Sequence, residues 1–176
     1  MFSARKANSQ DLQLLMKMDG ECFVYGWDAD AWRHAIKNFQ IYIGTWNYKP
    51  IGYWVACKDE EDGNRFRAIR LGVRIDQRGK EFSLDLYEHL EQTAANLGFK
   101  SLYSVVPESL CRPSEFGYCA GWLNKVGLMA TGELIKQFFR DHGTEYDGFV
   151  FTKFISPDKA RPPVDPFEGF TDDFID

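Results

Sequence analysis

The sequence has no long apolar run and no excess of positive charge. The first residues, from Met1 to Lys6, lack the apolar core of a signal peptide, and no segment has the length of apolar chain that spans a bilayer. The formal net charge is −5 and the pI is near 5.3, which argues against general attraction to nucleic acid or to anionic membranes. We therefore expect a cytoplasmic protein that binds neither a membrane nor nucleic acid in general.

Cysteine and histidine are scarce and scattered. The chain has 4 cysteines and 3 histidines, and neither a CxxC pair, a Ser/His/Asp pattern nor a metal-ligand spacing joins them. We interpret the cysteines as reduced thiols packed in an intracellular protein: Cys22, Cys57, Cys111 and Cys119. No metal site is expected.

The composition that is present is typical of one globular domain. The chain has 176 residues, 44% of them hydrophobic and 27% charged, which is enough to bury one core. The composition changes after Ile155, where several prolines interrupt regular structure. We expect a domain over residues 1–155 and a separate tail over residues 156–176.

Hydrophobic periodicity predicts an alternating order of helices and strands. Helical spacing covers residues 12–23, 32–39, 82–97 and 114–126, and strand patterns cover residues 40–46, 51–58, 66–75, 101–106, 133–140 and 149–155. Gly98 follows the third helix as a left-handed C-cap glycine would. This order predicts an α/β fold in which one mixed central sheet has helices on both faces and residues 66–106 form a parallel crossover.

Arginines are frequent around the strand predicted over residues 66–75. Strand alternation is expected to divide Arg65, Arg67, Arg70 and Arg74 between the two faces, so they do not form one stripe for nucleic acid. They remain candidates for holding an acidic substrate or a neighbouring subunit.

The polar turn after this strand leads directly into a helix, and it reads Gln77-Arg78-Gly79-Lys80-Glu81-Phe82-Ser83. Without gaps it resembles the acetyl-CoA loop of the GNAT (GCN5-related N-acetyltransferase) superfamily, written R/Q-x-x-G-x-G/A. Lys125-Val126-Gly127-Leu128 resembles a later K-x-G-F element of the same family. The resemblance covers about residues 3–155, and it implies a GNAT-like fold that also has a strand near Ala4.

The resemblance implies an acetyl-CoA-dependent N-acetyltransferase that acts on a primary amine of a peptide or a small molecule. In such a site, consecutive N–H groups at a helix N-terminus hold the pyrophosphate, and an N–H on the central strand polarises the thioester carbonyl. The residues that it assigns to acetyl-CoA are Val73, Gln77, Arg78, Gly79, Lys80, Glu81, Phe82 and Ser83.

Two departures from the family pattern concern this chemistry. Glu81 and Ser83 stand where the family has two glycines, and a carboxylate about 5 Å from a phosphate repels it by on the order of 1 kcal/mol. Leu123 stands where the family often has a tyrosine that protonates the leaving thiolate. Tyr118 is then the candidate acid and Glu108 the candidate base, although a packing tyrosine and a surface glutamate would fit the same positions.

These departures leave a second class of function open. A catalytically inactive GNAT-fold domain would serve as a binding or structural module, for example in a larger assembly such as a phage particle. The tail alternates aromatic and acidic residues, and Phe167, Phe170 and Phe174 are candidate anchors for a protein partner. Folding of the tail over its own domain is the alternative, and an oligomer is compatible with either.

Overall fold

A computed structural model describes residues 1–23, 26–111, 120–141 and 144–156. One 7-stranded sheet has the order β1-β2-β3-β4-β5-β7-β6. β4 and β5 run parallel, and every other neighbouring pair is antiparallel. The predicted α/β fold with a mixed sheet is confirmed.

The strands are β1 (Phe2–Lys6), β2 (Gln40–Trp46), β3 (Lys49–Lys58), β4 (Arg65–Val73), β5 (Ser101–Pro107), β6 (Met129–Asp141) and β7 (Thr144–Phe154). The α-helices are α1 (Leu12–Cys22), α2 (Ala29–Asn38), α3 (Phe82–Asn96) and α4 (Ala120–Lys125). Short 3₁₀ helices are η1 (Ser9–Asp11), η2 (Ile75–Gln77) and η3 (Glu108–Leu110). In the described ranges no helix combines the length and the apolar character needed to cross a membrane.

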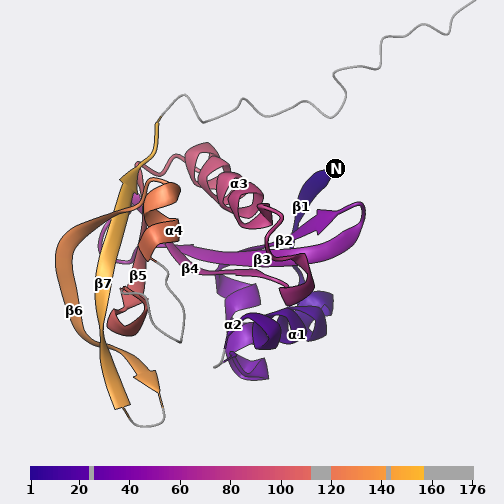
Figure 1. The fold of residues 1–176 in the computed structure, drawn as a ribbon, viewed down its shortest axis with the longest axis horizontal. Coiled ribbons are helices and arrows are strands. Elements are labelled where there is room, and N and C mark those ends of the chain that lie inside the picture. Colours follow the sequence, from indigo (N-terminus) through magenta and orange to yellow (C-terminus); the bar gives the residue numbers. More distant parts are fainter. Residues whose placement is uncertain (24–25, 112–119, 142–143, 157–176) are drawn as a thin grey trace, which may run out of the picture.

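Two apolar cores lie on the two faces of the sheet. On one face, α1 and α2 pack Leu15 and Trp32 against Tyr53 of β3. On the other, α3 and α4 cover the sheet, and Leu86 packs with Trp54 of β3. Figure 1 shows α1 and α2 on one side of β3 and α3 on the other. Because both faces of β3 are buried, its residues 51–56 are all inaccessible.

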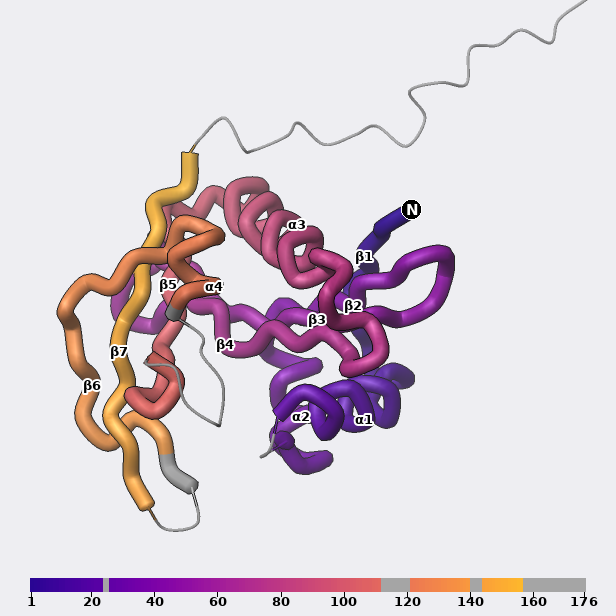
Figure 2. The backbone as a smooth tube through the Cα atoms, viewed as in Figure 1, coloured from indigo at the N-terminus to yellow at the C-terminus, as the bar shows by residue number. Residues whose placement is uncertain are grey.

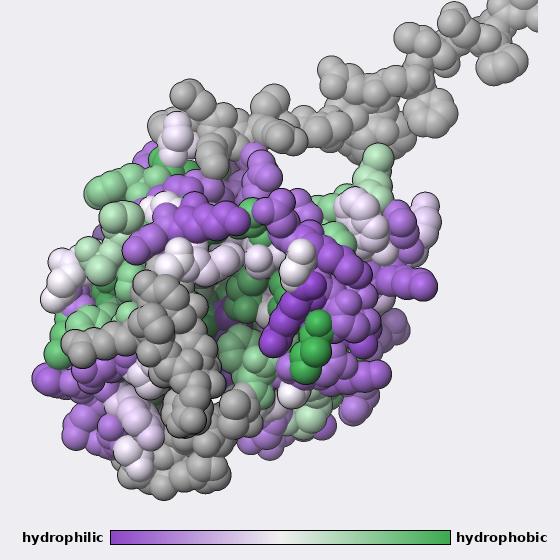
Figure 3. Space-filling view, in the orientation of Figure 1, coloured by the Kyte–Doolittle hydropathy of each residue, from purple (hydrophilic) through white to green (hydrophobic). Residues whose placement is uncertain are grey.

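The elements differ from the sequence expectation mainly at their ends. Gly98 has a φ of +83° and ends α3 as predicted. β6 and β7 are each longer than predicted and form a hairpin on the far side of the molecule from β1 to β3 (Figure 2). A helix was expected over residues 114–126, and α4 corresponds to its second half. Residues 112–119 lie outside the described part of the chain. Hydrophilic side chains cover much of α3 on the face in view in Figure 3.

β4 contains a bulge that changes which side chains share a face. Val55 pairs with Arg70, whereas its neighbour Ala56 pairs with Ala68, so Ile69 is one extra residue in β4. Ile69 and Arg70 both contact the α1–α2 side, and Ala68 belongs to the α3 side. The bulge therefore reverses the alternation that the sequence suggested.

The expectation that the arginines divide between the two faces is wrong for this reason. Phe66 packs in the α3 core, so Arg65 and Arg67 beside it point to the α1–α2 side. After the bulge, Arg70 pairs with Asp19 of α1 and Arg74 pairs with its Glu21. All four arginines project from the same face of the sheet: Arg65, Arg67, Arg70 and Arg74.

Candidate functional site

β4 and β5 separate partway along their length. Their last paired residues are Arg67 and Tyr103. Beyond this point residues 68–73 of β4 and 104–107 of β5 form no backbone pairs with each other in the described part of the chain. We call this stretch of unpaired backbone the β4–β5 gap.

The end of β4 presents a backbone N–H toward the β4–β5 gap. The Arg74 N–H donates to the Ile51 carbonyl at 2.9 Å, so the N–H and C=O of Val73 face the opposite edge of the strand, away from β3. The Val73 carbonyl accepts from Cys22 Sγ and from Arg78 Nε, each at 3.3 Å. By the same alternation the Val73 N–H faces the β4–β5 gap, where no described strand pairs with it, and an N–H in this position can polarise a carbonyl oxygen.

Within the described part of the chain, the loop from β4 to α3 leaves a run of backbone N–H groups without acceptors. The N–H groups of Gln77 and Arg78 donate to carbonyls one turn earlier, at 2.9 and 3.3 Å. For residues 79–83, no acceptor for the backbone N–H occurs among the described residues, and no side chain caps the start of α3. Such groups at the positive end of a 15-residue helix favour an anion.

The backbone of this loop adopts the conformation that glycine would favour. Gly79 and Glu81 have φ of +77° and +60°, whereas Lys80 between them does not have a positive φ. Alternation between the two hands of backbone is the geometry in which successive N–H groups form an anion-binding nest. A left-handed conformation strains a residue with a side chain, so the position of Glu81 is one at which the family's glycine fits better.

The side chains of the loop bind neighbouring groups and do not cap the helix. The Glu81 carboxylate lies 3.7 Å from Lys125 Nζ of α4, so Lys125 offsets part of its negative charge. Lys80 Nζ donates to Gln77 Oε1 at 3.2 Å. Arg78 turns back to the Val73 carbonyl, so in this structure its guanidinium is not directed at the N–H groups of residues 79–83.

Of the two candidate catalytic residues, the structure describes Glu108 but not Tyr118. Glu108 begins η3 directly after β5, and its side chain is exposed at the end of the strand that borders the β4–β5 gap. Tyr118 lies outside the described residues. Leu123, at the position of the family tyrosine, is buried in the α3–α4 core and has no proton to give.

A buried polar network joins α1 to the sheet, and the sequence analysis did not identify it. Asp19 is fully buried and accepts from Tyr53 Oη, from Arg70 Nη1 and, at 2.6 Å, from the Trp27 N–H. Burial, followed by the negative charge of Asp19, raises the pKa of Tyr53. The available signal was that Asp19 occupies a position of the apolar stripe of α1, where a carboxylate needs partners.

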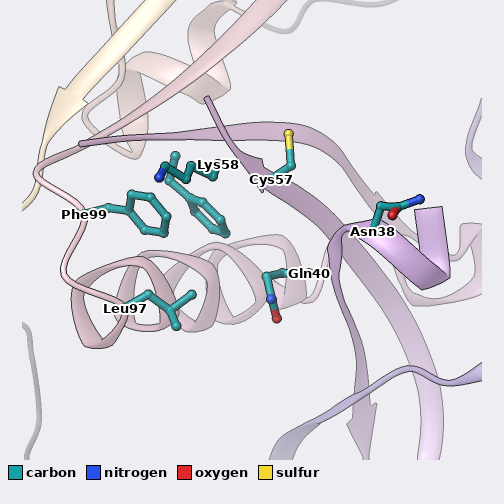
Figure 4. Close-up of a pocket in the computed structure, with 7 residues that line it drawn as sticks. Asn38, Gln40, Cys57, Lys58, Leu97 and Phe99 are labelled. Atoms are coloured by element: carbon teal, nitrogen blue, oxygen red, sulfur yellow. The ribbon is translucent and has the colours of Figure 1, made fainter. Parts of the chain in front are cut away.

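A shallow pocket of about 260 Å³ lies at the other end of α3. Leu97 and Phe99, just after that helix, line it together with Lys58 and Cys57 (Figure 4). A helix of 15 residues is about 22 Å long, so this pocket is well separated from the loop before α3. Its lining lacks a pair of acid and base groups, so the β4–β5 gap is the stronger candidate site.

The sequence matches no protein-family model and no curated protein, whereas the fold matches many solved structures. One is the ribosomal-protein-S18-alanine N-acetyltransferase from Escherichia coli, with a TM-score of 0.71 and 14% identity over 89% of this chain and 95% of that one. Another is NAA60 from Arabidopsis thaliana in complex with a bisubstrate analogue, with a TM-score of 0.68 and 14% identity over 89% and 99%.

A Desulfovibrio desulfuricans protein assigned to the GNAT family has a TM-score of 0.73 and 11% identity over 89% of this chain and 100% of that one. Identities this low establish the fold and not the activity. The shared architecture includes nearly the whole length of each relative. The chain therefore has the fold of the GNAT superfamily.

Proposed function

We propose that the protein is an acetyl-CoA-dependent N-acetyltransferase that acylates a primary amine. The observation that carries the proposal is that the unpaired end of β4 continues directly into residues 79–83, whose N–H groups have no acceptor among the described residues. One strand–loop–helix unit then offers a donor to a carbonyl oxygen and, next to it, several donors to a phosphate. The structural neighbours that are N-acetyltransferases support the same activity.

The hydrogen-bond donors of the loop suit a pyrophosphate, whereas its charge suits one less well. Free N–H groups, the helix dipole and the nearby Lys80 and Lys125 attract an anion. The Glu81 carboxylate opposes it by on the order of 1 kcal/mol at about 5 Å. Because Glu81 is paired with Lys125 and does not occupy the N–H groups, its charge weakens binding without blocking the site.

When bound, acetyl-CoA supplies a thioester, whose carbonyl carbon takes the amine to give an amide and a free thiol. The Val73 N–H would hold the carbonyl oxygen, and the alternation of β4 already directs it into the β4–β5 gap. Glu108 would accept the proton of the amine at the end of β5, and Tyr118 would protonate the thiolate in place of the missing tyrosine at Leu123. Glu108→Gln is expected to lower kcat with little change in acetyl-CoA affinity.

Titration calorimetry with acetyl-CoA tests the proposal directly. We expect the wild-type protein to bind, Glu81→Gly to bind about fivefold more tightly, and Lys80→Glu about tenfold more weakly, because each change alters the charge near the phosphates. Lys37→Glu on α2 is the matched control, since Lys37 is exposed on the opposite face, and its affinity should equal that of wild type.

Absence of binding at millimolar acetyl-CoA in both the wild type and Glu81→Gly would reject the transferase. The second class of function, a catalytically inactive module with this fold, would then be the better account. The Glu81→Gly variant matters for this decision, because it removes the charge and the strain that distinguish the loop from the family pattern.

A further inference from the structure

Tyr87, in the second turn of α3, carries a buried hydroxyl for which the described residues provide no partner. Its exposed fraction is 5%, and its Oη forms no hydrogen bond within the described ranges. Tyr53 and Tyr103, which are also buried, each donate to a carboxylate. A buried hydroxyl without a partner costs stability, and a phenylalanine would fill the same space without that cost. We therefore looked for a ligand group that the Tyr87 hydroxyl could bind.

Tyr87 lies over the two strands that border the β4–β5 gap. Its neighbour Leu86 reaches β3, since a Cβ added at Gly52 would meet Leu86 Cδ1 at 2.8 Å. On the other side, Lys153 of β7 places its Nζ 5.4 Å from the centre of the Tyr87 ring. In the sheet, β4 and β5 lie between β3 and β7. The Tyr87 ring is therefore held above β4 and β5, on the α3 face.

This turn of α3 lies at the level of Val73, where the thioester carbonyl is proposed to bind. The Cβ position at Gly52 that meets Leu86 is also 3.2 Å from Val73 Cα, and Gly52 is the strand partner of Val73. Side chains of a helix lean toward its N-terminus. The Tyr87 side chain is therefore expected to lean toward the start of α3, which follows the open end of the β4–β5 gap.

Trp122 of α4 lies between Tyr87 and the loop before α3. Its ring meets the Tyr87 ring edge-on, with 5.7 Å between the ring centres, and its Nε1 donates to Ser83 Oγ at 3.2 Å. Ser83 belongs to the run of residues 79–83 that is proposed to hold the pyrophosphate, and Trp122 is partly exposed. A ligand that extends from this run into the gap therefore passes Trp122 and then Tyr87.

The Tyr87 hydroxyl is suited to donating a hydrogen bond. Burial, followed by the negative charge of Glu91, raises the pKa of Tyr87, so the hydroxyl keeps its proton at neutral pH. A carbonyl oxygen is the natural partner of such a donor. In acetyl-CoA, the pantetheine arm joins the pyrophosphate to the thioester and carries amide carbonyls along its length.

We propose that Tyr87 binds the pantetheine arm of acetyl-CoA, its Oη donating a hydrogen bond to an amide carbonyl where the arm enters the β4–β5 gap. This assignment rests on the proposed function. It deepens that function by giving the arm a side-chain partner on the α3 face, in addition to the backbone N–H groups of β4 and the loop. Trp122 turns aside to admit the arm. Tyr87 is a binding residue and transfers no proton.

Titration calorimetry with two probes tests the assignment. Tyr87→Phe should bind acetyl-CoA about fivefold more weakly than wild type, the usual loss for one hydrogen bond. It should bind adenosine 3′,5′-diphosphate, which lacks the arm, as wild type does. Tyr42→Phe is the matched control, because Tyr42 of β2 stacks on Trp54 beneath the same helix but away from the gap. Its affinity for both probes should equal that of wild type.

Thermal unfolding without ligand gives a second readout. Tyr87→Phe should have a midpoint equal to that of wild type or higher, because the lost hydroxyl has no partner among the described residues. A lower midpoint would show that the hydroxyl serves the core, and it would overturn the assignment.

The same measurements separate failure of the assignment from failure of the proposed function. Equal affinity of wild type and Tyr87→Phe for acetyl-CoA overturns the role of Tyr87 and leaves the transferase standing. An equal loss of affinity for both probes has the same meaning, because the change then acts on the loop and not on the arm. If the wild-type protein binds no acetyl-CoA at millimolar concentration, the proposed function and the assignment both fail.

Discussion

Helices α2 and α3 lie on opposite faces of the sheet and begin in different ways. α2 starts after Asp28, whose side chain accepts from the Ala31 N–H at 2.8 Å. α3 starts after Glu81, which has a left-handed backbone and provides no cap. A helix whose only task is packing is stabilised by a cap. The uncapped start of α3 leaves its first N–H groups without a side-chain acceptor among the described residues, as the proposed acetyl-CoA site requires.

The two helices also differ in the ion pairs that they carry. Asp30 and Arg33 of α2 form a pair in which both side chains are mostly exposed. Glu91 of α3 is buried, with 2% of its surface exposed, and it pairs with Lys153 of β7 at 2.9 Å. A buried ion pair therefore joins α3 to the sheet, whereas the exposed pair of α2 lies within that helix. Each of these differences can be tested with a pair of variants.

The largest effect is expected from removing the buried pair. Glu91→Ala should lower the free energy of unfolding by about 3 kcal/mol, because it leaves Lys153, itself only partly exposed, without its carboxylate in a region of low dielectric. Urea unfolding measures the loss. Asp30→Ala on α2 is the matched change, and exposed pairs contribute little, so its unfolding midpoint should stay close to wild type. Similar losses in both variants would contradict the contrast.

A smaller effect is expected at the helix starts. Asp28→Ala should lower the free energy of unfolding by about 1 kcal/mol, the usual loss for a capping residue. Glu81→Gly should raise it by up to about 1 kcal/mol, because glycine adopts a positive φ without strain. Thermal unfolding of both variants at one pH gives the comparison. A stability loss in Glu81→Gly would mean that the carboxylate contributes more through Lys125 than the strained backbone costs.

Much of the fold followed from local patterns in the sequence. The strand, turn and helix from β4 to α3 and the glycine that ends α3 are set by short-range periodicity and by backbone preference. β1 was recognised through the family resemblance and not through its own pattern, because Phe2–Lys6 is a short, partly exposed edge strand of 5 residues. The long β6–β7 hairpin was underestimated because the register of β6 is interrupted at two places and most described side chains of β6 are exposed.

The features that matter most for the site depended on long-range register. The bulge at Ile69 arises from the pairing of β4 with β3, and no property of the β4 sequence alone places Arg67 and Arg70 on one face. The ion pair of Glu81 with Lys125 joins residues far apart in the chain. The sequence could identify the loop as unusual, but only the fold could show where the charge of Glu81 is directed.

The smallest expected effect concerns the histidines of the same two helices. His89 of α3 is partly buried and accepts from Trp54 Nε1 at 3.2 Å, and burial lowers its pKa. A histidine in the unfolded chain has a pKa near 6.5. Just below that pH, His89 binds a proton in the unfolded state and not in the folded state. The contribution of His89 to the free energy of unfolding is therefore fully present above the unfolded pKa. It is lost as the pH falls through the pKa of His89 in the folded protein.

His34 of α2 is exposed and is the matched control. In wild type, the free energy of unfolding should decrease between pH 7.5 and pH 5.5, and His89→Gln should remove part of that decrease because the glutamine does not titrate. His34→Gln should leave the decrease unchanged. Urea unfolding at both pH values provides the measurement. An equal pH dependence in wild type and His89→Gln would mean that the α3 side of the sheet admits a charged imidazole, and the contrast between the two helices would then be limited to their starts and ion pairs.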